Sequence, residues 1–423
     1  MRVLVVGNGG REHALALALN KSTLVERVFA TRPNAGMAEF CGNVDVDISE
    51  TETVVDAARH TDIDLVVIGP EGPLVNGMSD RFMEAGIPVL GPSASAARLE
   101  GSKRFAKELM RDAGIPTAGY ATFKKAEKAI AYVKDNGRPM VVKADGLASG
   151  KGVIVGTNVA NTEAAIRKIL DDKAYGDAGA EIVLEERLSG PEVSVIALVD
   201  GETVRPFPPA RDHKRALDGD NGPNTGGMGA FSPVRQVDQS MMAEIVQTIL
   251  LPAAKSLAAF GMPYRGFLYA GIMLTQEGPK VLEFNCRMGD PECQILMSRL
   301  TSDAGELFLA GATGQLADAT ITFDRRPGVC VVLASGGYPD SYQTGFTIDG
   351  LEEAAEIQDV TVYHAATKRE GHRIVTNGGR VITVTALGNE FGQAIRRAYE
   401  AVDRIQFTAR HCRRDIAATS VIL

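Results

Sequence analysis

Several residue types and patterns are scarce in this sequence. It contains no tryptophan and only 6% aromatic residues, so it offers few side chains on which single-stranded nucleic acid could stack. The five cysteines are an odd number without a Cys-x-x-Cys pair, which argues against a disulfide framework or a zinc site. No apolar run approaches the ~18 residues that span a membrane. We therefore expect a cytoplasmic protein that binds neither nucleic acid nor membranes.

The overall balance of residues is that of a globular protein. Hydrophobic residues make up 45% and charged residues 23% of the 423 positions. The net charge of −8 makes a general nucleic-acid binder unfavourable, although phosphates can still bind locally. The length predicts several domains. The 45 glycines cluster in short motifs, and those motifs carry the functional signal.

The first hundred residues alternate between apolar runs and helical patterns. Runs at 2–6, 28–30, 65–68 and 88–90 read as strands, with helices at 12–20, 51–60 and 78–85 between them. This order predicts a parallel sheet covered by helices on both faces. Because ligands of open parallel sheets bind at the carboxyl ends of the strands, the turns after these strands should face one crevice.

The pattern changes after residue 101. Helices at 103–113 and 162–170, with strands within 140–155 and at 182–185, predict a small α+β lid. A long helix is expected near 241–260, and new strands at 328–334 and 380–386 precede a helix at 390–403. The predicted fold is thus a multidomain α/β and α+β protein, with domains at 1–101, 102–320 (lid about 118–188) and 321–423.

The segment Gly7–His13 follows the first strand and opens a helix. It suggests the dinucleotide fingerprint G-x-G-x-x-G, but Glu12 occupies the third glycine position. The next strand also lacks the acidic residue that binds a ribose. A ligand on the helix N-terminus and a plain tight turn remain open, because backbone N–H groups there favour anions. His13 is as compatible with a structural hydrogen bond as with chemistry.

Two lysines and three glycines lie between the strands of the predicted lid, in KADGLASGKG from Lys143 to Gly152. The loop lacks the spacing and the hydroxyl of a Walker A motif. A glycine-rich hairpin can still close over a triphosphate with its N–H groups, while Lys143 supplies a fixed charge. An ordinary exposed hairpin is the alternative.

Glu283, Asn285 and Arg287 alternate along another predicted strand, so they share one face while Phe284 and Cys286 point into the core. A carboxylate, an amide oxygen and a guanidinium suit a hard divalent cation beside phosphate oxygens. A solvated sheet face is the alternative.

Residues 212–215 and the glycine-rich stretch 222–229 could offer cations and N–H groups to a substrate, or form a charged turn and a flexible loop.

Taken together, these motifs resemble the ATP-grasp superfamily, and within it the phosphoribosylamine–glycine ligases. The resemblance covers essentially the whole chain, through VVGNGGREHALA, PNAG, IGPEGPLV, LEGSKRFAKELM, VVKADGLASGKGV, PNTGGMGAFSP, GFLYAGIM, LEFNCRMGDPE, ASGGYP and TNGGRV. It implies that ATP, glycine and 5-phosphoribosylamine are the small-molecule substrates, joined through a glycyl phosphate. It also implies Mg²⁺ or Mn²⁺ as cofactor, and we expect a monomer or weak homodimer.

The resemblance also assigns roles to residues. Two lysines would contact the ATP phosphates, and Glu185, the Leu188 backbone and Glu192 would read adenine and ribose at the interdomain hinge. The full ATP-binding set is Lys107, Lys143, Gly146, Ser149, Gly150, Lys151, Gly152, Glu185, Glu186, Leu188 and Glu192. The metal ligands would be Glu283 and Asn285, and the catalytic residues Arg287, Lys214 and Asp290. The substrate-binding residues would be Asn8, Gly9, Gly10, Asn34, Gly36, Gly69, Pro70, Glu71, Asp212 and Lys214.

The sequence departs from the superfamily pattern at two places, and three other functions are alternatives. The acidic metal ligand that often precedes Glu-x-Asn is absent near Gly271, and HAATK at 364–368 has no glycine in its third position. The metal should therefore depend more on phosphate and water. The rivals are an ATP-grasp ligase or carboxylase with another acceptor, a nicotinamide-dependent oxidoreductase and a non-catalytic nucleotide sensor.

Overall fold

The computed structural model describes residues 1–148 and 152–420. The N-terminal part is a sheet of five parallel strands in the order β3-β2-β1-β4-β5. Its strands are β1 (Arg2–Val6), β2 (Arg27–Thr31), β3 (Gly42–Val44), β4 (Leu65–Ile68) and β5 (Val89–Leu90). Its helices are α1 (Gly10–Asn20), η1 (Met37–Glu39), α2 (Thr51–His60), α3 (Glu71–Val75), α4 (Met78–Glu84) and α5 (Ala94–Gly101). The predicted parallel sheet is confirmed.

Both faces of this sheet are buried, which explains why its strands read as continuous apolar runs. Along β1, Leu4 and Val6 belong to one hydrophobic cluster, whereas Val3 and Val5 belong to another. The alternation of side chains along a strand produces this division.

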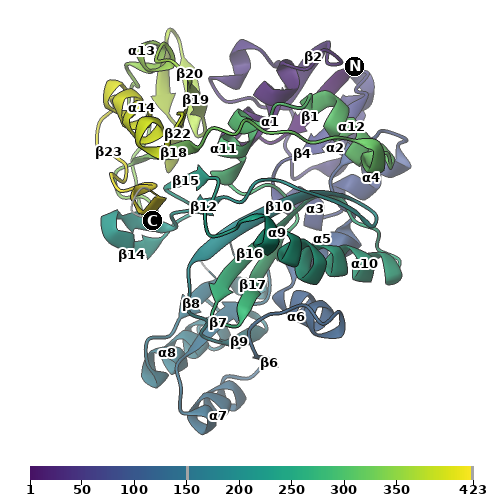
Figure 1. Cartoon of the computed structure of the whole chain (residues 1–423), viewed down its shortest axis with the longest axis vertical. Helices are drawn as coiled ribbons and strands as arrows, with labels where there is room; N and C mark the ends of the chain where they lie inside the picture. The colour runs from purple at the N-terminus through teal and green to yellow at the C-terminus, as the bar shows by residue number, and fades with distance from the viewer. Residues whose placement is uncertain (149–151, 421–423) are drawn as a thin grey trace.

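The lid forms a separate lobe at the bottom of Figure 1. Its antiparallel sheet has the order β6-β9-β7-β8. Its elements are β6 (Tyr120–Phe123), α7 (Ala126–Asn136), β7 (Met140–Ala144), β8 (Val153–Val155), α8 (Val159–Leu170), η2 (Gly176–Gly179) and β9 (Ile182–Glu186). Helix α6 (Lys103–Asp112) precedes it. The lobe has a hydrophobic core of its own, whose buried residues all lie between Ala126 and Leu184.

A four-stranded antiparallel sheet in the order β11-β10-β16-β17 occupies the middle of the molecule (Figure 1). Its strands are β10 (Glu192–Asp200), β11 (Thr203–Pro206), β16 (Arg265–Thr275) and β17 (Gly278–Asn285). The expected long helix is made of α9 (Gln239–Ile245), a π-turn η4 (Val246–Leu250) and α10 (Leu251–Ala259). Helices α11 (Glu292–Arg299) and α12 (Ala304–Thr313) and the turn η5 (Leu316–Asp318) follow.

The helical segment Gln239–Ala259 is, in the described part of the chain, the one helix long and apolar enough to cross a membrane. Length and composition alone are weak evidence, because core helices pass the same test. Ile245, Ile249 and Leu257 are fully buried in the hydrophobic core, whereas Gln247 and Lys255 are exposed, so the segment packs on the core through one face only.

The C-terminal sheet takes strands from two distant parts of the chain. Its order is β12-β15-β18-β22-β19, with β23 paired to β18. The strands are β12 (Arg211–Asp212), β15 (Gly229–Ser232), β18 (Gly328–Ser335), β19 (Val360–His364), β22 (Arg380–Leu387) and β23 (Arg410–His411). Around it lie β13 (Arg215–Leu217), η3 (Asp218–Asp220), β14 (Asn221–Asn224), α13 (Leu351–Ala355), β20 (Thr367–Glu370), β21 (Arg373–Thr376), α14 (Phe391–Arg404) and η6 (Ala418–Ser420).

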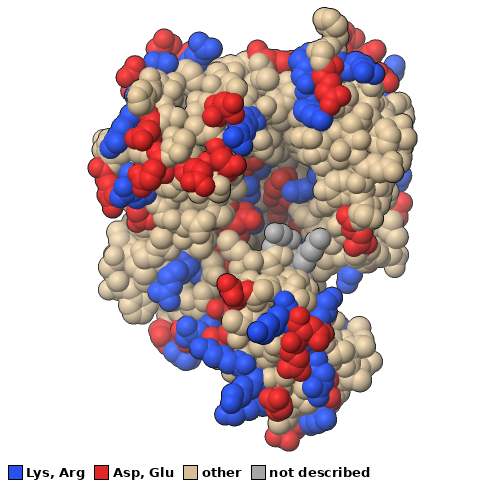
Figure 2. All heavy atoms as spheres, turned by 180° about the vertical axis from the view of Figure 1, so that it is seen from behind, with Lys and Arg blue, Asp and Glu red and all other residues tan. Residues whose placement is uncertain are grey.

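Strands β12 and β15 precede the predicted boundary at residue 320 by about a hundred positions, yet they complete the sheet that was expected to begin near 328. This pairing places Gly229, the end of the glycine-rich stretch 222–229, beside β18, and Asp212 one strand further out, beside β15. The view from behind is hollowed between the lid lobe and the rest of the molecule, and acidic and basic side chains gather inside the hollow (Figure 2).

Candidate active site

Two lysines share one buried carboxylate where helix α6, the lid sheet and strand β17 meet. Lys107 Nζ lies 3.0 Å from Glu185 Oε2, and Lys143 Nζ lies 2.8 Å from Glu185 Oε1. The Lys143 ammonium also donates to the Leu282 carbonyl at 2.8 Å, and that of Lys107 donates to Thr117 Oγ1 at 2.7 Å. The side chains of Lys107, Lys143 and Glu185 are 2%, 7% and 2% exposed, so this group is almost dry.

The charges of this group sum to a net positive charge, which favours the binding of an anion. Burial lowers the pKa of Lys107 to about 8, against the attraction of Glu185 and with repulsion from Lys143. Two ammonium groups and one carboxylate leave a net positive charge beside a pocket that Lys103 and Glu283 also line. A phosphate chain entering the pocket would complete the neutralisation.

The lid hairpin is fastened at its base. The Asp145 carboxylate accepts hydrogen bonds from the Arg104 N–H at 2.7 Å and from the Ser102 hydroxyl at 3.0 Å, which ties β7 to the start of α6. Gly146 N donates to Ala178 O at 3.0 Å, and Gly152 is buried against Ala148. The predicted ligands Ser149, Gly150 and Lys151 lie outside the described residues.

The predicted hinge residues lie between the lid and the central sheet. Glu186 accepts a hydrogen bond from the Gly119 N–H at 3.1 Å, and Leu188 is half-buried in the segment between β9 and β10. Glu192 begins β10, and its carboxylate lies 3.1 Å from Lys214 Nζ. Glu185 was expected to contact the adenine edge, but its carboxylate forms ion pairs with Lys107 and Lys143. The contacts with adenine and ribose remain predictions.

The predicted metal ligands Glu283 and Asn285 lie at the end of β17. Burial opposes ionisation of Glu283, but nearby cations lower its pKa to about 2; these are Lys214, Lys103, Lys143 and Arg287. Gly271 pairs directly with Glu283 across β16 and β17, so the position of the missing acidic ligand is a glycine beside the carboxylate. Within residues 1–148 and 152–420, no group of three His, Cys, Asp or Glu side chains could hold a metal ion.

This donor set fits a divalent metal that depends on its substrate. An ionised carboxylate and an amide oxygen are hard donors suited to Mg²⁺ or Mn²⁺, but they supply too few ligands for six-coordination. Phosphate and water oxygens would fill the other positions, as the sequence predicted.

Arg287 lies just beyond β17 and connects it to the N-terminal part. Its Nε lies 3.1 Å from Glu71 Oε2, and its Nη2 lies 2.9 Å from Glu100 Oε1. Although burial opposes the charge, these two carboxylates raise the pKa of Arg287 above its ordinary value. Phe284 and Cys286 are buried in the core, as expected, with 2% and 1% of their surface exposed. The guanidinium is thus fixed at the junction of two layers.

Asp212 and Lys214 also lie near Glu283. Burial raises the pKa of Asp212 to about 7, against the attraction of Lys214 and with repulsion from neighbouring carboxylates. The same Asp212 raises the pKa of Lys214 well above its ordinary value. Lys214 is therefore a cation beside Glu192, and its role in stabilising an acyl phosphate remains a prediction.

The N-terminal turn is held by its own polar side chains. Asn34 Nδ2 donates to Asn8 O at 2.8 Å and to His364 O at 2.9 Å, while Asn34 Oδ1 accepts from Gly36 N at 3.1 Å. His13 Nδ1 accepts the His364 N–H at 2.9 Å, so this histidine makes the structural hydrogen bond. A side chain at Gly36 would collide with both histidine rings, so only glycine fits there.

Glu12 fills the space where a dinucleotide fold needs its third small residue. Its Oε2 accepts the Gly9 N–H at 2.7 Å, and its Oε1 lies 2.6 Å from Arg11 Nε. A Cβ added to Gly69 would lie 2.1 Å from Glu12 Oε1, so the carboxylate spans the crevice between Gly9 and the Gly69-Pro70 turn. A negative charge in this place is unfavourable for the pyrophosphate of a nicotinamide cofactor.

Four residues of the candidate site were not predicted from the sequence. Arg11 Nη1 lies 3.9 Å from Glu71 Oε2. The Glu100 carboxylate accepts hydrogen bonds from Arg287 Nη2 and from the Cys286 N–H. Arg380 Nη2 lies 2.7 Å from Asp290 Oδ2, and Thr117 bridges Lys107 to Val281 O. Arg11, Glu100 and Arg380 each lie inside a motif that carried the resemblance, which was the only signal available for them.

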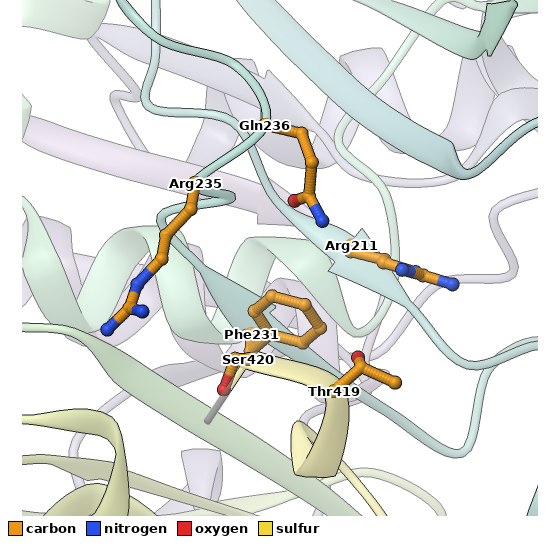
Figure 3. A pocket seen from close by; sticks show the side chains of 6 residues that line it. All are labelled: Arg211, Phe231, Arg235, Gln236, Thr419 and Ser420. Carbon is orange, nitrogen blue, oxygen red and sulfur yellow. The ribbon is translucent and has the colours of Figure 1, made fainter. Parts of the chain in front are cut away.

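A second pocket lies beside β12 and the end of the described chain. Arg211, Phe231, Arg235, Gln236, Thr419 and Ser420 line it. Figure 3 shows the guanidinium groups of Arg211 and Arg235 pointing away from one another. The cations do not converge, so this pocket lacks the geometry of an anion site.

The folds and the lysine–carboxylate arrangement define an ATP-grasp enzyme. Family models for the N domain, the ATP-grasp domain and the C domain of phosphoribosylglycinamide synthetase match residues 1–100, 101–293 and 328–419. The chain belongs to the phosphoribosylglycinamide synthetase family.

Individual relatives agree with this family. A phosphoribosylamine–glycine ligase of Allochromatium vinosum is 50% identical over 424 residues, covering 100% of this chain and 99% of the relative. The crystal structure of a phosphoribosylamine–glycine ligase from Thermotoga maritima has a TM-score of 0.85 at 33% identity, covering 98% and 100% of the two chains. The biotin carboxylase domain of a Hydrogenobacter thermophilus 2-oxoglutarate carboxylase has a TM-score of 0.73 at 17% identity, covering 97% and 91%, and shares the fold.

Proposed function

We propose that the protein ligates glycine to 5-phosphoribosylamine at the expense of ATP, giving glycinamide ribonucleotide, ADP and phosphate in purine biosynthesis. The observation that carries this proposal is the 50% identity over 424 residues to a phosphoribosylamine–glycine ligase. That identity spans the N-terminal crevice as well as the ATP-grasp region. An ATP-grasp enzyme with a different acceptor, like the biotin carboxylase neighbour at 17% identity, shares the fold only.

The first half of the reaction is attack of the glycine carboxylate on the γ-phosphorus of ATP. Lys107 and Lys143 would neutralise the phosphate oxygens, and the net positive charge around Glu185 supports this role. Gly146, Ser149, Gly150, Lys151 and Gly152 would close over the triphosphate, and Glu185, Glu186, Leu188 and Glu192 would bind adenosine. Positioning and charge neutralisation carry most of the rate in phosphoryl transfer.

The second half is attack of the phosphoribosylamine nitrogen on the carbonyl carbon of glycyl phosphate, which releases phosphate. Arg287 and Lys214 would stabilise the acyl phosphate, and Asp290 would take part in catalysis with them. Asn8, Gly9, Gly10, Asn34, Gly36, Gly69, Pro70 and Glu71 would bind the sugar phosphate, and Asp212 and Lys214 would also contact the substrates. The fixed guanidinium of Arg287, held between Glu71 and Glu100, supports its assignment to a site shared by two layers.

Glu283 and Asn285 would hold a divalent metal, Mg²⁺ or Mn²⁺. When bound, such an ion neutralises the β- and γ-phosphate oxygens. The low pKa of Glu283, about 2, keeps this donor ionised throughout the physiological range.

Three further expectations belong to this proposal. The domains would be residues 1–101, 102–320 and 321–423, with a lid at about 118–188 that moves during the cycle. The enzyme would act in the cytoplasm on small molecules only. It would be a monomer or a weak homodimer.

Heavy-oxygen labelling tests the proposal. Glycine labelled in both carboxylate oxygens should deliver one label to inorganic phosphate per turnover and keep the other in the amide, because one oxygen becomes the bridge of the glycyl phosphate. Mass spectrometry of the products measures both. Label in AMP would indicate adenylation, and unlabelled phosphate would contradict the acyl-phosphate route. ADP release with a panel of amino acids, with and without freshly made phosphoribosylamine, tests the substrates.

A further inference from the structure

Two C-terminal motifs, ASGGYP at 334–339 and TNGGRV at 376–381, have no role in the proposed reaction so far. Each brings one side chain to Gly226 in the glycine-rich stretch 222–229. The Tyr338 hydroxyl accepts a hydrogen bond from the Gly226 N–H at 3.0 Å. Arg380 Nη1 donates to the Gly226 carbonyl at 2.8 Å. Both backbone polar groups of one glycine are therefore held by side chains that follow it by more than a hundred residues.

The guanidinium of Arg380 lies close to the backbone of Gly226. A Cβ at Gly226 would lie 3.1 Å from Arg380 Cζ, so the guanidinium lies directly against the backbone of the loop. This close contact and the two hydrogen bonds together restrict the position of the loop at Gly226.

The same guanidinium also holds Asp290. Arg380 Nη1 donates to the Asp290 carbonyl at 2.7 Å, and Arg380 Nη2 lies 2.7 Å from Asp290 Oδ2. The other carboxylate oxygen of Asp290 accepts Gln294 Nε2 at 2.7 Å. One cation thus joins the glycine-rich stretch to the loop that follows Arg287.

The held loop in turn supports Lys214. Thr225, next to Gly226, donates from its N–H and from its hydroxyl to the Lys214 carbonyl at 2.7 and 2.8 Å. Lys214 Nζ lies 3.1 Å from Glu192 Oε2 on β10. A shift of Gly226 would therefore move Thr225 and the backbone of Lys214.

We propose that Tyr338 and Arg380 are positioning residues, which hold Lys214 and Asp290 in place for the glycine-dependent steps of the reaction. The inference rests on the proposed function. It assigns the C-terminal part a task in the chemistry besides any contact with the sugar phosphate. A role confined to domain stability would affect all ligands equally, whereas positioning of Lys214 acts mainly on glycine and reaches the nucleotide only through the ion pair with Glu192.

The test uses two conservative variants. Tyr338→Phe removes only the acceptor of the Gly226 N–H. Arg380→Lys keeps the charge but loses the planar fork that reaches several acceptors at once. Neither residue is among those that contact Lys107, Lys143 or Glu185, so nucleotide affinity should not change.

Two matched controls come from the same part of the chain. The Tyr399 hydroxyl also accepts a backbone N–H, that of Ile416, at 3.1 Å. Arg326 also makes ion pairs, with Asp324 at 2.8 Å and Asp359 at 3.0 Å. Tyr399→Phe and Arg326→Lys therefore report the cost of losing equivalent bonds away from the glycine-rich stretch.

The measurements are kcat/KM for glycine in ADP formation with phosphoribosylamine present, the Kd of a non-hydrolysable ATP analogue, and the urea midpoint. Arg380→Lys should lower kcat/KM for glycine about 100-fold, the scale of a small misplacement. Tyr338→Phe should lower it about five- to ten-fold, the scale of one hydrogen bond. The analogue Kd should stay within about two-fold, and the urea midpoint should fall no more than in the controls.

Two results would overturn the inference. One is parental kcat/KM for glycine in both variants. The other is a parallel loss of analogue affinity and stability that the two controls reproduce. A parent enzyme that forms no ADP with glycine and phosphoribosylamine would overturn the proposed function itself, and this inference with it.

Discussion

Two charged regions of the molecule are built in opposite ways. The nucleotide region, Lys107, Lys143, Glu185, Glu283 and Asn285, lies entirely within the matched ATP-grasp domain, residues 101–293, and its lysine–carboxylate group is at most 7% exposed. The acceptor region, Arg11, Glu71, Glu100 and Arg287, joins residues that are 187 and 216 positions apart, with Glu71 30% exposed. The first region therefore depends on burial, and the second depends on how distant parts of the chain dock.

The difference determines what a substitution should do. Where charges are buried, the loss of one group leaves its partners unpaired and, in the proposed reaction, removes a strong interaction with the phosphates. Where charges join two layers, the loss of one group loosens the junction. Turnover should then fall because the catalytic groups are displaced. The predictions below separate these two outcomes.

The largest effect is expected for Lys143→Ala. Turnover should fall about 10²- to 10³-fold, the scale on which one preorganised electrostatic contact acts. Lys124→Ala is the matched control, because Lys124 pairs with Glu181 on the same lid but is 75% exposed. Steady-state ADP release measures both variants. Near-parental turnover in Lys143→Ala would remove this residue from the site.

The second-largest effect is expected on the magnesium requirement. Glu283→Gln and Asn285→Ala should each raise the magnesium concentration needed for half-maximal rate about 10- to 100-fold. Glu277→Gln is the control, since Glu277 lies in the same hairpin and pairs only with Lys280 at the surface. Magnesium titrations of the rate decide this point, and an unchanged requirement in both site variants contradicts the assignment.

In the acceptor region, Glu100→Gln should lower the free energy of unfolding by about 1.5 kcal/mol, because a charged hydrogen bond to buried Arg287 is lost. Nucleotide affinity should not change, whereas turnover should fall. Glu84→Gln breaks an exposed ion pair with Arg81 and should change stability by less than about 0.5 kcal/mol. Urea unfolding and calorimetry of an ATP analogue test the contrast. A loss of nucleotide affinity equal to that of Lys143→Ala would erase it.

The same contrast explains what the sequence revealed. The lid strands β7, β8 and β9, the lysine near the end of β7 and the alternation of Phe284 and Cys286 depend on local patterns, and the structure has them where the patterns put them, although the lid strand β6 was not predicted. The pairing of β15 with β18, which brings β12 into the same sheet, could not be predicted, because β12 and β15 are short and β18 is about a hundred residues away. Glu100 and Arg380 look like surface charges until the chain folds, since their partners Arg287 and Asp290 are remote.

Histidines offer a pH-dependent test of the comparison, because none lies between residues 61 and 212, where most of the nucleotide region is found. Burial lowers the pKa of His13 to about 3, and that of His213 and His364 to about 4. His13 and His364 join the N-terminal turn to β19, and His213 precedes Lys214.

A folded-state pKa below the unfolded value gives stability that is present above pH 6.5 and is lost as pH falls toward the folded pKa. Between pH 6.5 and 4, each of these histidines should lower the free energy of unfolding by about 1.4 kcal/mol per pH unit, as the unfolded chain takes up a proton that the folded chain excludes. The acceptor side should therefore loosen in mild acid before the lid does. Hydrogen exchange at pH 5 and pH 7.5, read by segment, measures this order. Exchange that accelerates first in β7 and β9, with β19 and the turn after β1 unchanged, would show that the acid-sensitive region is the nucleotide region instead.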